Sequence, residues 1–318
     1  MSGGANPHLP VVFVTGPTAA GKSALAMALA AHYGGEIISA DSAQVYRGMN
    51  IGTAKPSADE QMRVPHHLLD ICDPAEAYST ARFVADARAA IRGVQERGRL
   101  PLVVGGTNLY LRALEFGISD LPSADPALRE SISAAAAAQG WPAMHHRLGE
   151  LDPQRAAQLH PNDGQRIQRA LEIVQSTGKT VAHWYAQPRA DAMSPAPLKL
   201  GVIPGSRARL RSSIAERFRQ MMAAGFLDEV VRLYQRSDLT RELPSIRSVG
   251  YRQLWAHLEG ECSLDVAVER AIIATGQFAK RQMTWLNSET RLQRLNSEES
   301  NLLQKANKLI DTHVRSPL

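Results

Sequence analysis

The chain has 318 residues and a mass of 34.6 kDa, which at about 150 residues per domain favours two domains or one core with a large insertion. Hydrophobic residues make up 44% of the chain and charged residues 21%, so we expect a packed core and no global disorder. Two cysteines, Cys72 and Cys262, are too few for a disulfide framework or a four-cysteine zinc site. No apolar run approaches the roughly 20 residues of a membrane span. We therefore expect a cytoplasmic protein with no membrane partner. We also expect a monomer, although the composition itself does not determine the oligomeric state.

The positive charge is concentrated in one part of the chain. The net charge is +5, and residues 201–294 carry 15 Lys and Arg against 10 Asp and Glu, so this segment accounts for the whole excess. Nearly all of its cations are arginines, whose planar guanidinium groups bind phosphate through two hydrogen bonds. The charge favours a surface for a polyanion such as nucleic acid, although a set of solvated helix faces would have the same composition.

Short apolar runs alternate with helical periodicity over the first 121 residues. Strands that alternate with helices are typical of an α/β protein with a doubly wound parallel sheet. The pattern predicts strands at 11–14, 36–40 and 100–104, and helices at 23–31 and 79–96.

The strand pattern fades after residue 121, and the next 60 or so residues are mostly helical, with one clear helix at 165–177. Beyond a Pro-containing link we predict a strand at 198–204, long helices at 209–234 and 263–286, and a surface helix within 298–318. The predicted organisation is a P-loop NTPase-like α/β core formed by 1–121 and 196–318, with a helical insertion domain at 122–195.

A phosphate-binding loop follows the first predicted strand. The spacing G-x-x-x-x-G-K-[ST] is met between a strand and a helix, which is the context that the motif requires. Backbone N–H groups at such a helix N-terminus surround a phosphate, Lys22 neutralises it, and the hydroxyl of Ser23 can bind Mg²⁺. The predicted diphosphate-binding residues are Gly16, Pro17, Thr18, Ala19, Ala20, Gly21, Lys22 and Ser23.

The acidic Mg²⁺ ligand of P-loop kinases is missing from its usual place. The strand at 100–104 is followed by Gly105, Gly106 and Thr107 without a carboxylate, whereas Asp41 follows the strand at 36–40. Because ligands bind at the carboxyl ends of parallel strands, Asp41 and Thr107 are both expected to face the phosphate-binding loop.

These residues belong to a longer pattern that resembles the bacterial tRNA dimethylallyltransferases, also called tRNA isopentenyltransferases. Asn50 stands where Asp is common in that family. The matching stretches follow the family order over nearly the whole chain and are 16–23, 39–49, 51–56, 65–70, 103–107, 165–169, 217–218, 247–252 and 279–285.

The resemblance implies transfer of a dimethylallyl group from dimethylallyl diphosphate to N6 of the adenosine 3′-adjacent to the anticodon, position 37, of tRNA. Lys22, Mg²⁺ on Ser23 and, by resemblance, Arg217 would offset the charge on the diphosphate leaving group. Thr107 would hydrogen-bond the bridging oxygen, and Asp41 would accept a proton from the adenine amine. Mg²⁺ is thus the expected cofactor.

The resemblance also implies which residues contact the anticodon stem-loop of tRNA. The target base must leave its stack to reach the site, and Ser42 and Gln44 resemble residues that hold such a base. The full set of expected tRNA contacts is Asp41, Ser42, Ala43, Gln44, Arg129, Gln165, Arg166, Ile167, Gln168, Arg169, Arg247, Ser248, Val249, Gly250, Tyr251, Arg252, Lys280 and Arg281.

Three other functions are compatible with a phosphate-binding loop. A small-molecule kinase is disfavoured by the missing acid after Val104, and a prenyltransferase acting on a free adenine nucleotide is disfavoured by the arginine-rich segment 201–294. A nucleotide-switched RNA-binding protein would need no general base at Asp41.

Overall fold

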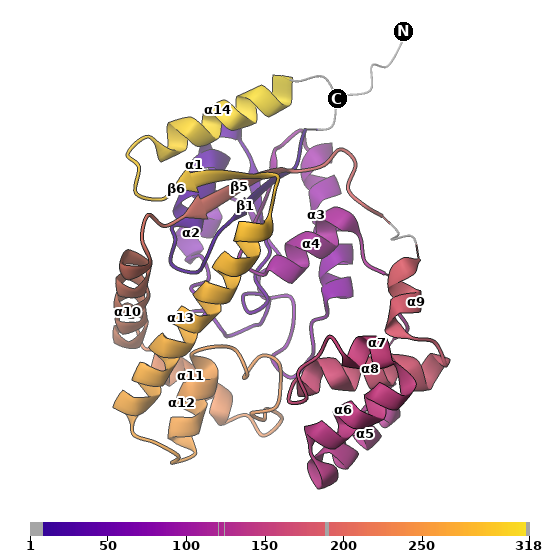
Figure 1. The fold of residues 1–318 in the computed structure, drawn as a ribbon. Coiled ribbons are helices and arrows are strands. Elements are labelled where there is room, and N and C mark those ends of the chain that lie inside the picture. Colours follow the sequence, from indigo (N-terminus) through magenta and orange to yellow (C-terminus); the bar gives the residue numbers. More distant parts are fainter. Residues whose placement is uncertain (1–8, 120, 124, 188–190, 316–318) are drawn as a thin grey trace. The chain divides into compact units, whose positions relative to one another are not determined.

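The computed structural model describes residues 9–119, 121–123, 125–187 and 191–315, and divides the chain into two compact units. Unit 1 combines residues 1–115 with 193–318, and unit 2 comprises residues 116–192. Both borders lie a few residues before those expected from sequence (122 and 195). Figure 1 shows the mixed α/β character of unit 1 and the purely helical character of unit 2.

Unit 1 is built on a six-stranded sheet in which every pair of neighbouring strands is parallel. The strand order is β3-β2-β4-β1-β5-β6, so the prediction of a doubly wound parallel sheet is confirmed. The strands are β1 (Val12–Thr15), β2 (Glu36–Ser39), β3 (His66–His67), β4 (Pro101–Gly105), β5 (Leu198–Ile203) and β6 (Leu292–Asn296). The short edge strand β3 and the polar strand β6 were not predicted, because neither has an apolar run.

Helices cover both faces of the sheet, as buried parallel strands require. One face packs against α1 (Lys22–Tyr33) and α14 (Leu302–Arg315) in a single apolar core. Helix α3 (Thr80–Glu96) packs on the sheet through β2 and β4, and its Phe83 stacks on Tyr110 of α4 (Asn108–Phe116). The other helices of unit 1 are α2 (Ala58–Arg63), α10 (Arg207–Ala223), α11 (Phe226–Tyr234), α12 (Tyr251–Leu258) and α13 (Leu264–Ser288).

One predicted helix differs in the structure. The single helix expected over 209–234 is wrong, because Gly225 adopts a left-handed conformation (φ 93°) that ends α10 and begins α11. The helix predicted within 298–318 is present as α14, whose outer face is exposed while Ala306 and Ile310 on its inner face are fully buried in the core.

Unit 2 is an all-helical body with its own apolar core. Its helices are α5 (Pro126–Gln139), α6 (Trp141–Leu151), α7 (Pro153–Ala156), α8 (Gly164–Thr177) and α9 (Val181–Ala186). Helix α8 is close to the predicted 165–177; Asp163 accepts a hydrogen bond at its N-terminus, and Gly178 ends it with φ 68°. Ile132, Leu148 and Leu171 are among the side chains that fill the core.

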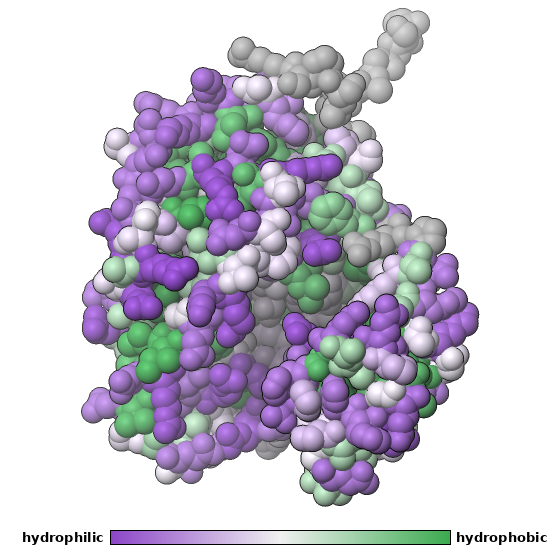
Figure 2. All heavy atoms as spheres, in the orientation of Figure 1, coloured by the Kyte–Doolittle hydropathy of each residue, from purple (hydrophilic) through white to green (hydrophobic). Residues whose placement is uncertain are grey.

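The outer surface is mainly hydrophilic on the face drawn in Figure 2, where hydrophobic residues form small separate patches. Isolated patches of this kind are normal for a folded protein surface. In the part of the chain that the structure describes, no helix combines the length and the apolar character needed to cross a bilayer.

A buried carboxylate joins three elements at the start of β2. Glu36 is only 2% exposed and accepts hydrogen bonds from the guanidinium groups of Arg97 (3.0 and 2.7 Å) and Arg99 (3.2 Å). The Oε2 atom of Glu36, which accepts one of the hydrogen bonds from Arg97, also lies 2.6 Å from Nε2 of His67. The hydrogen bonds from Arg97, followed by those from His67, outweigh burial and lower the pKa of Glu36 to about 2.

We expect the variant Glu36→Gln to be less stable than the wild type at neutral pH and equally stable near pH 2. The native pKa lies below that of the unfolded chain, so the ionised carboxylate stabilises the fold above about pH 4.5 and this contribution is lost as the pH falls towards 2. The expected difference in unfolding free energy at pH 7 is on the order of 2 kcal/mol. Urea denaturation at several pH values measures it, with Glu269→Gln on the exposed surface as control. If the difference in unfolding free energy between the variant and the wild type were the same at pH 7 and pH 2, it would contradict the lowered pKa of Glu36.

Candidate active site

A pocket of about 600 Å³ lies entirely in unit 1, at the carboxyl edge of the sheet. Strand β4 is hydrogen-bonded to β1 on one side and to β2 on the other, so the loops after these three strands meet at one place. These loops contribute Thr18, Asp41 and Thr107 to the pocket wall, and further parts of the wall come from α1, the loop at 52–56, α10, the segment 244–249 and α13. The expectation that Asp41 and Thr107 face the phosphate-binding loop is confirmed.

Two glycines shape the phosphate-binding loop, and both have positive φ angles. At Gly16 (φ 154°) a Cβ atom would lie 2.3 Å from the carbonyl oxygen of Val202 in β5, so no side chain fits there. Gly21 (φ 88°) stands immediately before α1. The loop therefore passes close to the sheet and turns directly into the helix, which leaves Lys22 and Ser23 on the pocket wall.

Two cationic side chains, Lys22 and Arg217, interact with the Asp41 carboxylate on the pocket wall, which also includes Arg247 and Glu60. Lys22 donates a hydrogen bond to the carbonyl of Pro17 (2.7 Å). Burial lowers the pKa of Lys22 to about 8; Asp41 opposes this shift and the nearby Arg217 adds to it. Burial also lowers the pKa of the Arg217 guanidinium on α10, again opposed by Asp41. Two half-buried cations that share one neighbouring carboxylate favour the binding of an anion.

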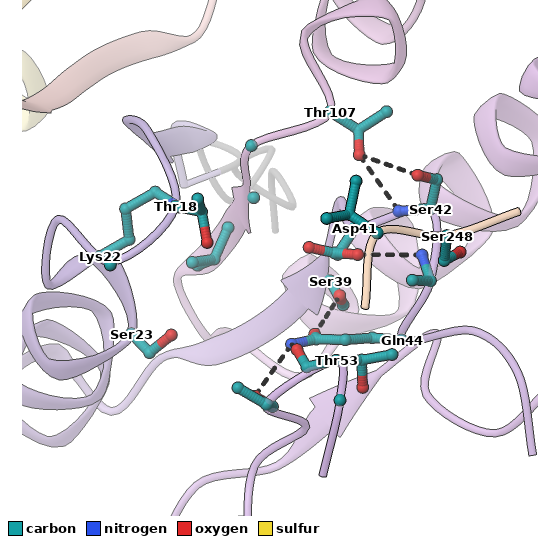
Figure 3. A pocket seen from close by; sticks show the side chains of 18 of the residues that line it. Thr18, Lys22, Ser23, Ser39, Asp41, Ser42, Gln44, Thr53, Thr107 and Ser248 are labelled. Atoms are coloured by element: carbon teal, nitrogen blue, oxygen red, sulfur yellow. Dashed lines mark hydrogen bonds between the residues drawn. The ribbon is translucent and has the colours of Figure 1, made fainter. Parts of the chain in front are cut away.

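Asp41 and the hydrogen-bonded pair Ser42 and Thr107 lie on the opposite side of the pocket from Lys22 and Ser23 (Figure 3). Oδ1 of Asp41 accepts the backbone N–H of Ala43 (2.9 Å), which fixes the carboxylate in a local turn. Oγ1 of Thr107 accepts the N–H of Ser42 (3.1 Å) and donates a long hydrogen bond to its hydroxyl (3.4 Å). The Thr107 hydroxyl is thus oriented, and its proton can turn to a ligand oxygen.

Gln44 lines the pocket, but its amide is already engaged with the protein. Its Oε1 accepts from Ser39 (2.9 Å), and its Nε2 donates to the carbonyls of Thr53 and Ala54 (both 3.2 Å). In this conformation Gln44 ties the end of β2 to the loop at 50–55. A contact between the Gln44 amide and a base would require at least one of these hydrogen bonds to be exchanged.

The loop at 50–55 is held by a buried residue that the sequence did not indicate. Glu229 of α11 is 2% exposed. Its carboxylate accepts the N–H groups of Asn50 (2.9 Å), Ile51 (2.8 Å) and Gly52 (3.1 Å), and the hydroxyl of Tyr251 (2.6 Å). Four donors satisfy this carboxylate away from water.

The polar residue at the start of the same loop, Asn50, accepts a hydrogen bond from Lys55. The ammonium group of Lys55 donates to the carbonyl of Tyr46 (2.8 Å), to Oδ1 of Asn50 (2.8 Å) and to Asp70 (2.6 Å). Asn50 therefore supplies the acceptor oxygen that the Asp common at this position would supply.

The expected tRNA contacts at 247–252 divide into two groups. Arg247 and Arg252 are exposed, and Arg247 also lines the pocket together with Ser248 and Val249. Gly250 and Tyr251 are buried, and the Tyr251 side chain is completely inaccessible beside Phe226. The expectation that the Tyr251 side chain contacts RNA is thus wrong for this conformation. On α13, Lys280 and Arg281 are both exposed.

In unit 2 the expected tRNA contacts are residues 165–169 of α8 and Arg129 of α5. Gln165 and Arg166 are exposed, and Arg166 pairs with Asp163 (3.1 Å). Ile167 is completely buried in the core of unit 2, so the expected RNA contact of its side chain is wrong. A continuous helical stretch always places some of its residues on the inner face.

Arg129 and Arg169 meet at one buried carboxylate within unit 2. Glu172 lies 3.8 Å from the Arg129 guanidinium and 3.3 Å from that of Arg169, and is 2% exposed. Gln168 donates to the carbonyl of Arg129 (3.2 Å) and to the hydroxyl of Ser133 (2.7 Å). Residues far apart in sequence are thereby joined into one basic surface whose geometry is fixed.

The described residues contain no group of three or more His, Cys, Asp or Glu side chains that could hold a metal ion. The hydroxyl of Ser23 is an oxygen donor on the wall of the pocket. A single hydroxyl fits an ion that takes most of its ligands from a bound phosphate, which is how Mg²⁺ is commonly held.

The sequence matches two family models and many curated relatives. The model described as IPP transferase matches residues 44–289, and the one described as isopentenyl transferase matches residues 9–70. A tRNA dimethylallyltransferase of Alkalilimnicola ehrlichii is 56% identical, over 88% of both chains. That of Methylococcus capsulatus is 54% identical, over 88% of this chain and 90% of the relative.

Solved structures agree with the sequence matches. The tRNA isopentenylpyrophosphate transferase of Bacillus halodurans is 35% identical with a TM-score of 0.71, covering 96% of this chain and 97% of that one. A eukaryotic dimethylallyltransferase acting on tRNA is 28% identical with a TM-score of 0.80, covering 95% and 79%. With its phosphate-binding loop, Asp41 and Thr107 gathered in one pocket, this chain belongs to the IPP transferase family.

Proposed function

We propose that the protein transfers a dimethylallyl group from dimethylallyl diphosphate to N6 of adenosine 37, next to the anticodon, in tRNA. The observation that carries this proposal is the single pocket in which a phosphate-binding loop, two cations, Asp41 and Thr107 face one another. The names of the relatives support the choice of group and acceptor. Every residue of the pocket comes from one unit of one chain, so the proposed reaction needs no second copy.

The diphosphate is both the anchor of the donor and the leaving group. The bond between its bridging oxygen and C1 of the dimethylallyl group breaks, and the electron pair leaves with the diphosphate. Lys22 and Arg217 stabilise the charge that develops, and the Thr107 hydroxyl can donate to the oxygen that carries it. The absence of a carboxylate directly after β4, where Gly105, Gly106 and Thr107 stand, favours this role over transfer of a phosphoryl group.

Mg²⁺ fits the proposed donor site. Ser23 would bind it through the hydroxyl together with oxygens of the diphosphate, and Asp41 stands on the opposite wall of the same pocket. When bound, the ion would supply further neutralisation of the leaving group.

Asp41 is the proposed proton acceptor. The lone pair of the adenine N6 amine is delocalised into the ring, so the amine needs exact placement and loss of a proton as the new C–N bond forms. The hydrogen bond from Ala43 holds the Asp41 carboxylate in one orientation. The proton released from N6 goes to this carboxylate.

The tRNA is proposed to bind through exposed basic residues of both units. Arg247, Arg252, Lys280 and Arg281 in unit 1 are exposed, and the basic surface around Arg129 and Arg169 lies in unit 2. Phosphate contacts from these residues would position the RNA while the pocket receives the extruded base.

The direct test is the mass of tRNA after incubation with the protein, dimethylallyl diphosphate and Mg²⁺. We expect an increase equal to one dimethylallyl group, located at adenosine 37 by nuclease digestion. An increase on free adenine nucleotides but not on tRNA, or none at all, would refute the proposal.

We expect Asp41→Asn to lower kcat by roughly 10²- to 10⁴-fold, the usual contribution of a general base. Asparagine keeps the oxygen that accepts from Ala43 but cannot take a proton. The variant also removes the negative charge beside Lys22 and Arg217, so inorganic diphosphate should bind as well as before or more tightly. Asp59→Asn on the exposed surface of α2 is the control.

A titration with Mg²⁺ distinguishes a role of Asp41 as the base from a role as a metal ligand. If Asp41 mainly held the ion, Asp41→Asn would bind inorganic diphosphate more weakly and high Mg²⁺ would restore kcat. Either of these results would contradict its assignment as a base.

The affinity for inorganic diphosphate should depend on the protonation of Lys22. Its pKa is about 8 in the free protein and must rise when an anion binds. Below pH 8 the lysine is charged and affinity is constant; above pH 8 binding requires uptake of a proton, so affinity falls by up to about tenfold per pH unit.

Calorimetric Kd values for wild type and Lys22→Met across pH 6.5–9.5 would measure this effect. Their ratio cancels the titration of diphosphate itself and should shrink as the pH rises through 8. A ratio that stays constant up to pH 9.5 would show that Lys22 keeps its ordinary pKa.

A further inference from the structure

One polar residue lies in the apolar stripe of α13. The buried side chains of this helix are Ala267, Ala271, Ala279, Gln282 and Leu286, and Gln282 is only 4% exposed. A carboxamide in such a place is costly unless its donor and acceptor are both used.

Both halves of the Gln282 amide are engaged with loops of the active site. Its Oε1 accepts the backbone N–H of Thr18 in the phosphate-binding loop (2.9 Å), and its Nε2 donates to the carbonyl of Gly106 (2.9 Å). The two loops follow β1 and β4, so one amide bridges the element that holds a phosphate and the peptide that precedes Thr107.

The absence of a side chain at Gly106 is a condition for this bridge. A Cβ atom at Gly106 would lie 2.3 Å from Nε2 of Gln282, well inside contact distance. The next nearest atom is the carbonyl oxygen of Gly16, at 3.4 Å. An alanine at 106 would thus displace mainly the end of the Gln282 side chain.

The bridge also removes one donor from the phosphate-binding loop. Because the N–H of Thr18 points to Gln282, the phosphate must be bound by N–H groups later in the loop, nearer to the start of α1. Gln282 therefore affects where the diphosphate lies with respect to Thr107.

We propose that Gln282 is a positioning residue that sets the distance between the diphosphate and the Thr107 hydroxyl. This inference rests on the proposed function. Gln282 itself contacts backbone groups and performs no step of the reaction.

The experiment compares Gln282→Met, which keeps the volume of the side chain but forms neither hydrogen bond, with Gln277→Ala, an exposed position on the same helix. We expect Gln282→Met to lower kcat at least tenfold while the KM for tRNA changes less than about twofold, because a misplaced donor acts on the transition state. Gln277→Ala should match the wild type. An unchanged kcat, or a loss confined to the KM for tRNA, would overturn the proposal.

A double-mutant cycle tests the bridge from its other side. Gly106→Ala should lower kcat in the wild type but have little further effect in Gln282→Ala, where the colliding atoms are gone. If Gly106→Ala lowered kcat by the same factor in the wild type and in Gln282→Ala, the effect of Gly106 would not act through Gln282.

Amide hydrogen exchange gives a measurement that does not depend on the reaction. Gln282→Met should exchange faster than wild type at residues 17–20 and at residues 105–108, whereas a general loss of stability would accelerate exchange throughout unit 1. If the wild type failed to modify tRNA, the proposed function would fail while this measurement still decided whether Gln282 couples the two loops. Exchange unchanged in either segment would contradict the coupling.

Discussion

The central constraint of this structure is the position of β4 between β1 and β2. Parallel strands end at the same edge of a sheet, so the register that pairs Thr15 with Gly105, and Ser39 with Val104, brings three following loops together. The spacing is very close: a Cβ atom at Gly105 would lie 2.2 Å from the carbonyl oxygen of Ala40. Small residues at these strand ends are thus as necessary to the site as the side chains that face the ligand.

The second constraint is electrostatic. Lys22 and Arg217 are both desolvated in the pocket, and each gains its principal compensation from Asp41. Asp41 offsets only one of these two positive charges, and a diphosphate would neutralise the other. In the reaction proposed above, the negative charge grows on the leaving oxygen while Asp41 loses its own charge by accepting a proton. The same three groups would therefore favour both donor binding and the transition state.

Sequence patterns predicted the parts of this molecule that depend on local rules. The phosphate-binding loop, the four apolar strands and the facing positions of Asp41 and Thr107 follow from spacing and from the parallel sheet. Contacts between distant segments were not predictable in the same way. Ile167 and Tyr251 were expected at an RNA surface because they lie in continuous stretches, yet both are core residues. Arg166 and Arg252, which are next to them in sequence, are exposed, and only the orientation of the helix distinguishes the two kinds of position.

Gln282 and Glu229 share a signal that a sequence does contain. Each is a polar residue within the apolar face of a helix, and each uses its buried oxygen atoms to hold backbone N–H groups of a pocket loop. A buried polar group is stable only if it has partners, so such a residue indicates that another segment must come to it, although not which one. In this fold the partners are the loops that carry Thr107 and surround Gln44. The helices outside the sheet thus do more than cover it, because their few inward polar atoms determine how accurately the catalytic loops are placed.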